Sequence, residues 1–269
     1  MNHNPIILKL SLLLSALIIL SSCAGLLITG FYSAGSPAWQ AQAIGQDIID
    51  LFIAVPALLI TGIFAYRNKK TAVLIWGGII SFIVYTFLIY CFSVHFNRMF
   101  IVYCFVLGLS VYSLGHFVYL CSGMAGPVLI NKRCTGTIAI YFIIISISFY
   151  CLWLAEIIPA IAQNNVPPGL RETALLTNPV HVIDLSVFLP GILITGILLL
   201  KQNRWALLLT PALLSFFILM DITIGGLVLV MKLKGLPSNP VLIAIMGFLA
   251  ILSLLLLIGY LYKKKNAVV

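Results

Sequence analysis

Long apolar runs separated by short polar stretches make up almost the whole chain. A helix needs about 20 apolar residues to cross the hydrocarbon core of a bilayer, because each residue adds about 1.5 Å. The alternating pattern of a membrane β-barrel is absent from these runs. The pattern therefore predicts eight membrane-spanning α-helices, at residues 6–30, 47–66, 71–93, 99–122, 136–160, 181–200, 204–231 and 240–262.

The composition supports an integral membrane protein and excludes an ordinary soluble domain. Of the 269 residues, 62% are hydrophobic and 8% are charged, whereas a soluble globular domain has about 25% charged residues. The formal net charge is +9. No basic surface with interleaved aromatic residues is present, so the charge favours anionic membrane lipid as a partner and gives no support for nucleic acid.

The basic residues predict an orientation. Lys and Arg accumulate in the cytoplasmic loops of membrane proteins. If the N-terminus is cytoplasmic, 11 of the 15 basic residues fall on the inner side. The four that fall outside are Arg98, Arg171, Lys232 and Lys234. We therefore expect a multi-pass protein of a bacterial-type plasma membrane, with both termini inside.

One alternative concerns the first helix. The segment Leu20-Ser21-Ser22-Cys23 has the form of a bacterial lipoprotein cleavage site, and Lys9 and an apolar run precede it. Cleavage there would remove the first span and place lipid on Cys23. We favour an intact first helix, because an internal duplication requires it.

The chain matches itself when it is shifted by 134 residues. Nine of 20 positions are identical between residues 47–66 and 181–200, without a gap. The shared residues include Asp50 with Asp184, and Pro56 with Pro190. Such polar and helix-breaking matches are not explained by an apolar composition. The sequence predicts two parallel four-helix repeats, residues 1–134 and 135–269, related by a pseudo-two-fold axis along the membrane normal.

All six acidic residues fall on the outer side of the predicted topology. Asp47 and Asp50 are three residues apart and share a helix face, and His181 and Asp184 are their equivalents in the second repeat. Each pair precedes a proline, which frees a helix carbonyl that could face a cation. The predicted ligand-binding residues are Asp50 and Asp184 at the centre, surrounded by Asp47, His181, Glu156 and Asp221.

Structural interpretations of the same acids stay open. Asp47, Asp50 and Asp184 stand near predicted helix starts, where capping and the helix dipole favour a carboxylate. Glu156 and Asp221 stand near predicted outer C-terminal ends, where the dipole disfavours an anion. A salt-bridge network with the four outer cations would account for these two.

Three functional hypotheses follow. The first is a carrier or binding protein for a cation, a proton or a small cationic solute, with an outward-facing acidic pocket between the repeats. The second is an intramembrane enzyme that uses a metal or paired carboxylates on a lipid-type substrate at the outer leaflet, which requires Glu156, His181 and Asp184 to converge. The third is a non-catalytic scaffold. The sequence identifies no catalytic residue, metal ion, cofactor or oligomeric state.

Overall fold

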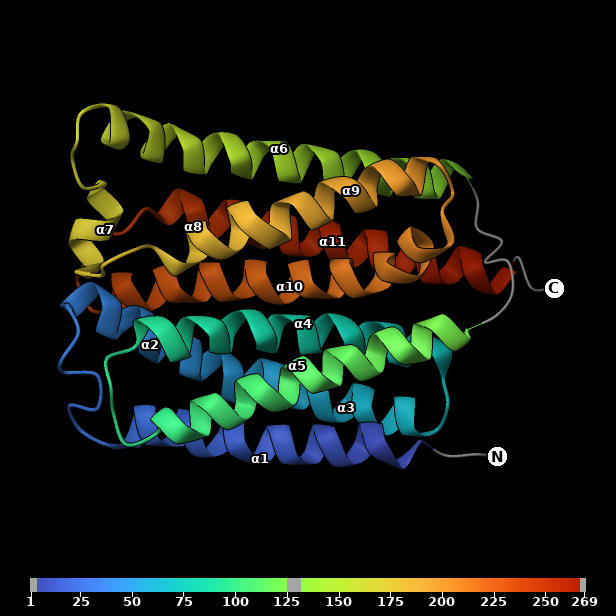
Figure 1. Ribbon diagram of the computed structural model, residues 1–269, viewed down its shortest axis with the longest axis horizontal. Helices are drawn as coiled ribbons and strands as arrows, with labels where there is room; N and C mark the ends of the chain where they lie inside the picture. The colour runs from blue at the N-terminus through green and yellow to red at the C-terminus, as the bar shows by residue number, and fades with distance from the viewer. Residues whose placement is uncertain (1–3, 125–131, 267–269) are drawn as a thin grey trace. The chain divides into compact units, whose positions relative to one another are not determined.

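The computed structural model describes residues 4–124 and 132–266, and these residues form helices and connecting turns without a strand. Eight helices in the described residues are long and apolar enough to span a membrane, which confirms the predicted all-α membrane class. Figure 1 shows the elements α1 (Pro5–Leu27), α2 (Pro37–Ile49), η1 (Asp50–Ala54), α3 (Val55–Tyr66), α4 (Lys70–Ser93), α5 (Phe100–Gly123), α6 (Lys132–Ala162), α7 (Pro168–Thr173), α8 (Pro179–Ile183), η2 (Asp184–Phe188), α9 (Leu189–Leu200), α10 (Arg204–Leu233) and α11 (Pro240–Asn266).

The second span is longer at its start than the sequence predicts. Helix α2 begins at Pro37, and the Ser36 side chain caps it by accepting a hydrogen bond from the Trp39 N–H at 3.2 Å. The helix then continues through η1 and α3 to Tyr66, so the candidate span covers 30 residues. Asp47 lies ten residues beyond the helix start, about 15 Å along the axis. The helix-start interpretation is therefore wrong for Asp47 and for Asp50, which follows it.

Two widened helical turns precede the matched prolines. In η1 the Val55 N–H donates to the Asp50 carbonyl, five residues back, and in η2 the Leu189 N–H donates to the Asp184 carbonyl. These are π-type turns, which occur mostly as single-turn insertions in α-helices and often at functional sites. Proline lacks an N–H, yet the helix continues past each proline, through α3 and α9.

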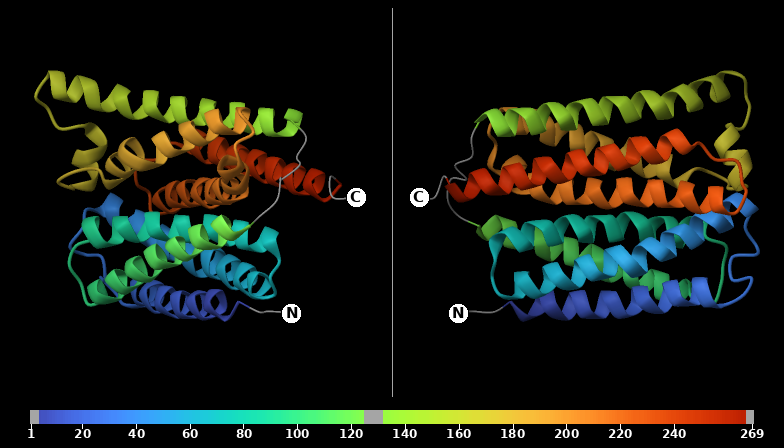
Figure 2. Two further views of the ribbon diagram at one scale, coloured as in Figure 1. Left: turned by 45° about the vertical axis from the view of Figure 1, so that its right-hand side comes forward. Right: turned by 180° about the vertical axis from the view of Figure 1, so that it is seen from behind.

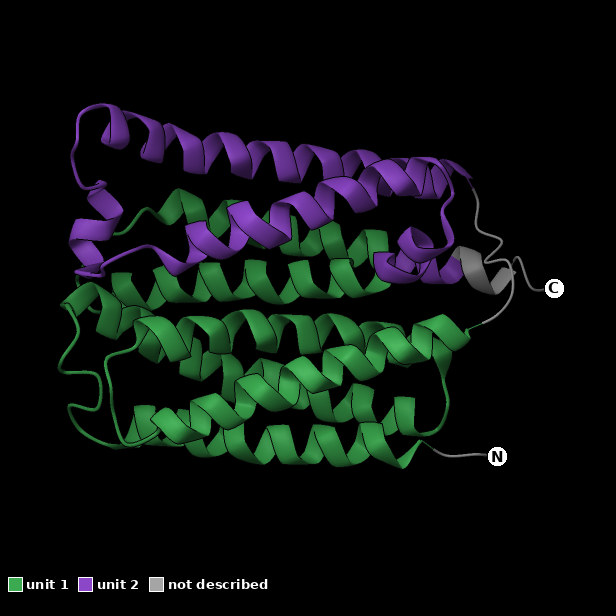
Figure 3. Cartoon of the chain, viewed as in Figure 1, with its two compact units in different colours: residues 1–125, 211–257 green, residues 126–210, 258–269 purple. Residues whose placement is uncertain are grey.

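The described chain divides into two compact units, drawn in different colours in Figure 3. Unit 1 covers residues 1–125 and 211–257, and unit 2 covers residues 126–210 and 258–269. The division passes through α10, between Thr210 and Pro211, and does not coincide with the predicted repeat boundary after residue 134. The repeat organisation stays a prediction.

Unit 1 is built around α1 and α4. Helix α1 packs against α2, α3 and α5, and α4 packs against α3 and α5. Figure 2 gives two further views of these helices. The indole N–H of the buried Trp76 in α4 donates to the Ser11 hydroxyl of α1 at 2.9 Å. Gly78 of α4 lies so close to α10 that an added Cβ would overlap the Ala212 carbonyl. Close backbone approach at small residues is a common way for membrane helices to pack.

Unit 2 is centred on the pair α6 and α9. The two helices pack along each other, and the Ser146 hydroxyl of α6 donates to the Leu189 carbonyl at 2.8 Å. At the other end of the pair, the Gln202 side chain donates to the Thr135 hydroxyl at 2.7 Å. These contacts hold η2 and its flanking residues against α6, which positions the acidic residues described below.

Candidate functional site

Asp47 is the centre of a buried polar cluster in unit 1. Its side chain has no solvent exposure. The Tyr32 hydroxyl donates to Oδ2 at 2.7 Å, and the Tyr90 hydroxyl of α4 donates to Oδ1 at 2.9 Å. Hydrogen bonds to a carboxylate are stronger than those between neutral groups. We refer to Tyr32, Gln46, Asp47, Asp50 and Tyr90 as the unit 1 carboxylate cluster.

A glycine makes room for this cluster. Gly25 lies in α1 opposite Asp47, and a Cβ added at Gly25 would overlap Oδ2 of Asp47. The same Cβ would lie 2.7 Å from the Tyr32 hydroxyl oxygen. The Asp47 carboxylate can occupy its position only because residue 25 has no side chain.

Asp50 is buried with only one of its oxygens paired. Its side chain is 2% exposed, and Oδ1 accepts a hydrogen bond from the Gln46 amide at 2.9 Å. Oδ2 is buried and has no hydrogen-bond partner in the described residues. Within the described part of the chain, neither Asp47 nor Asp50 forms an ion pair with a basic side chain. An unpaired buried charge is costly, so such a group is expected to be neutralised by a proton or by a cation.

Tyr32 connects the cluster to the loop between α1 and α2. It lies outside the candidate spans, and its side chain is buried. Burial, followed by the neighbouring Asp47 carboxylate, raises the pKa of Tyr32 well above its usual value. The hydroxyl therefore keeps its proton and stays a hydrogen-bond donor to Asp47 at every physiological pH.

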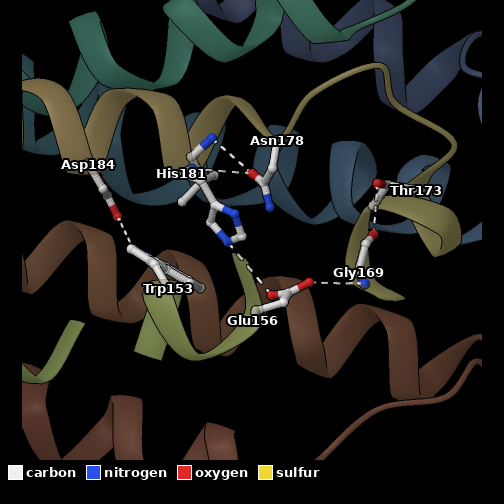
Figure 4. A network of polar contacts seen from close by, with 8 residues as sticks. Trp153, Glu156, Gly169, Thr173, Asn178, His181 and Asp184 are labelled. Carbon is white, nitrogen blue, oxygen red and sulfur yellow. Dashed lines mark hydrogen bonds and ion pairs between the residues drawn. The ribbon is translucent and has the colours of Figure 1, made fainter. Parts of the chain in front are cut away.

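Unit 2 contains a second polar network, which Figure 4 shows. The indole N–H of Trp153 in α6 donates to Oδ2 of Asp184 at 2.9 Å. The Trp153 ring also contacts the His181 ring, with centroids 4.5 Å apart. One tryptophan of α6 thus lies against both members of the predicted His-x-x-Asp pair.

Glu156 joins this unit 2 network from one turn further along α6. Its Oε2 lies 3.8 Å from Nε2 of the buried His181, and its Oε1 accepts a hydrogen bond from the Gly169 N–H of α7 at 3.2 Å. The Asn178 side chain caps α8 by accepting from the Val180 N–H at 3.0 Å. A histidine beside a carboxylate can exchange a proton with it.

The structure brings the predicted site residues together in two groups and leaves one apart. Asp47 and Asp50 share the unit 1 carboxylate cluster, and Glu156, His181 and Asp184 share the unit 2 network. Asp221 lies in α10 of unit 1, where it is 7% exposed and forms no hydrogen bond or ion pair with another described residue. A single pocket that holds all six residues stays a prediction.

The salt-bridge interpretation of Glu156 and Asp221 finds no support. In the described residues, neither carboxylate pairs with any of the four cations that the topology places outside, Arg98, Arg171, Lys232 and Lys234. The described part of the chain also contains no group of three His, Cys, Asp or Glu side chains that could hold a metal ion. The metal-dependent form of the enzyme hypothesis therefore gains no ligand set from this geometry.

The sequence pattern did not identify the residues that surround the acids. Tyr32 and Tyr90 stand 15 and 43 positions from Asp47, and Trp153 stands 31 positions from Asp184. Only the packing of helices brings such partners together.

The chain matches no protein family model, no curated protein and no solved structure.

Proposed function

We propose that this protein is a membrane carrier or binding protein for a proton, or for a small cation in its place, with Asp47 and Asp50 as the binding residues. The observation that carries the proposal is the Oδ2 atom of Asp50, which is buried without a hydrogen-bond partner in the described residues. Ionisable residues inside membrane spans are costly, and they typically mark ion pathways and proton relays.

The two carboxylates have different surroundings, which supports different roles for them. Asp47 accepts two tyrosine hydroxyl hydrogen bonds, an arrangement that suits the anionic form. Asp50 accepts one amide hydrogen bond and has a second oxygen available. We therefore assign the exchangeable proton to Asp50 and the positioning of the charge to Asp47. A proton needs no cavity, which fits a closely packed cluster.

Two further features favour movement of the bound ion over a purely structural role. Tyr32 belongs to a loop outside the candidate spans and donates directly to Asp47, so it supplies a polar link from the cluster toward the end of the helices. Asp50 also begins the widened turn η1. Discontinuities in membrane helices commonly accompany substrate and ion sites in transporters.

Infrared spectroscopy of the purified protein in lipid nanodiscs tests the proposal, because a protonated carboxyl group has a C=O band that its carboxylate lacks. We expect the part of this band that Asp50 contributes to decrease as the pH is raised in the wild type and to be missing from Asp50→Asn. Asp221→Asn is the matched control, since Asp221 is a buried acid of unit 1 without hydrogen bonds in the described residues; the Asp50 band should persist in it.

A second series distinguishes a proton from a cation. Titration with sodium or potassium at constant pH should leave the band unchanged if only a proton binds, and should remove it if the cation replaces the proton. A wild-type spectrum without a band that is sensitive to Asp50→Asn, together with unchanged thermal unfolding in the presence of either cation, would contradict the proposal.

A further inference from the structure

Two cysteines lie at the joined ends of α4 and α5 in unit 1. Cys91 is two residues before the end of α4, and Cys104 is four residues after the start of α5. These positions lie about 3 Å and 6 Å from the respective helix ends, at a rise of 1.5 Å per residue. The loop of residues 94–99 joins the two helices, which pack against each other. The two cysteines are therefore at a similar depth on neighbouring helices.

The neighbouring side chains fix the distance between the helices at this point. Tyr90 and Tyr103, the residues directly before the two cysteines, contact each other with ring centroids 5.1 Å apart. Both tyrosines are buried. Cys91 and Cys104 directly follow these two tyrosines in the chain, so the two thiols lie near each other at the joined ends of α4 and α5. Both cysteines are free, Cys91 is half-buried and Cys104 is exposed.

We propose that Cys91 and Cys104 are a reversible disulfide site that clamps the ends of α4 and α5 together. The oxidant is a disulfide-bonded compound or protein. The Cys104 thiolate attacks one sulfur of the oxidant, forms a mixed disulfide and releases one thiolate. The Cys91 thiolate then attacks the Cys104 sulfur and releases the second thiolate. Two cysteine thiols are oxidised, one disulfide is reduced to two thiols, and the two protons pass to the released thiolates.

The predicted orientation agrees with this chemistry. It places the loop of residues 94–99 on the outer side of the membrane, where disulfides form and persist. Cys104 is the more exposed of the two cysteines and lies about 6 Å from the start of α5, so we assign the first attack to Cys104 and the resolving step to the half-buried Cys91.

The clamp would act next to the unit 1 carboxylate cluster. Tyr90 donates a hydrogen bond to Asp47 at 2.9 Å, and it lies directly before Cys91. A disulfide would hold Tyr90 and Tyr103 in contact and so keep the Tyr90 hydroxyl on Asp47. This consequence rests on the proposed function, whereas formation of the disulfide does not.

Mass spectrometry after oxidation tests the site. The purified protein in nanodiscs is incubated with oxidised glutathione, denatured and alkylated with a maleimide, and the mass of the intact protein is then measured. We expect Cys91 and Cys104 of the wild type to lose their alkylatable thiols without carrying a glutathione adduct, and a digest to contain a peptide with Cys91 linked to Cys104. Reduction with a dithiol should restore both thiols.

Two variants complete the test. Cys104→Ser should lose the linked peptide, and Cys91→Ser should keep Cys104 as a glutathione adduct because no resolving thiol is present. Cys151→Ser, which removes an exposed cysteine of α6, should oxidise like the wild type. Glutathione adducts on the wild type without an internal disulfide, or a link between other cysteines, would overturn the proposal. Because the masses report the disulfide alone, they do not depend on whether Asp50 binds a proton.

Discussion

Substitution of Gly25 by alanine tests whether the Asp47 carboxylate is packed against α1. The added Cβ would overlap Oδ2 of Asp47 and would lie 2.7 Å from the Tyr32 hydroxyl oxygen and 2.9 Å from the Tyr32 ring. Neither neighbour can move freely, because Tyr32 and Tyr90 hold both oxygens of Asp47. The substitution must therefore displace the carboxylate, the tyrosine or the helix.

Two costs and one gain set the expected change in the free energy of unfolding. An extra methyl group in a packed core costs about 1–3 kcal/mol, and loss of the hydrogen bond between Tyr32 and the charged Asp47 costs a further ~1.5–3 kcal/mol. Alanine is favoured over glycine in a helix by about 0.5–1 kcal/mol, which offsets part of this cost. We expect Gly25→Ala to lower the free energy of unfolding by about 2–5 kcal/mol.

Equilibrium unfolding in mixed micelles measures this change. Gly115→Ala in α5 is the matched control, because a Cβ at Gly115 meets no atom within 4 Å, and this variant should be as stable as the wild type or more so. In an Asp47→Ala background the penalty of Gly25→Ala should fall by at least about 1 kcal/mol, the coupling expected of residues in contact. If Gly25→Ala behaves like Gly115→Ala, or if its cost is the same in both backgrounds, the reasoning is refuted.

Two further predictions concern unit 1. The pKa of Tyr32 is raised in the folded protein, so its contribution to stability is complete below about pH 10, the pKa in the unfolded chain, and is lost as the pH rises above that value. Tyr32→Phe should therefore make the decline of the unfolding free energy at alkaline pH less steep. An unchanged slope would contradict this. Gly78→Ala would place a Cβ against the Ala212 carbonyl. Because backbone moves less readily than a side chain, we expect the unfolding free energy in the same micelle assay to fall by at least about 1–3 kcal/mol. Stability equal to that of the wild type would show that α4 and α10 pack less closely than described.

The number and type of the helices could be predicted from the sequence. Runs of about 20 apolar residues have one stable arrangement in a bilayer, because every backbone polar group must be paired within the segment. The start of the second span could not be predicted in the same way. The segment after Pro37 contains Gln40, Gln42 and Gln46, so it lacks the apolar run that marks a span, although Ser36 and Pro37 form an ordinary helix start.

That difference changed the interpretation of the candidate site. With a helix start near residue 47, the carboxylates of Asp47 and Asp50 are explained as capping residues. With a start at Pro37, both lie inside a continuous helix, where the macrodipole gives them little support. The widened turns at Asp50 and Asp184 agree with the sequence match between residues 47–66 and 181–200, and the four-helix repeat itself stays a prediction.

The sequence by itself determined the membrane class, the helical spans and the acidic residues that require an explanation, because hydropathy and residue spacing are local properties of the chain. Only the tertiary structure decided which partners these acids have. Asp47 accepts hydrogen bonds from two tyrosine hydroxyls, and Asp184 accepts one from an indole N–H. One carboxylate oxygen of Asp50 has no hydrogen-bond partner in the described residues. Such pairings join residues far apart in the chain, and they depend on which faces of the helices pack together.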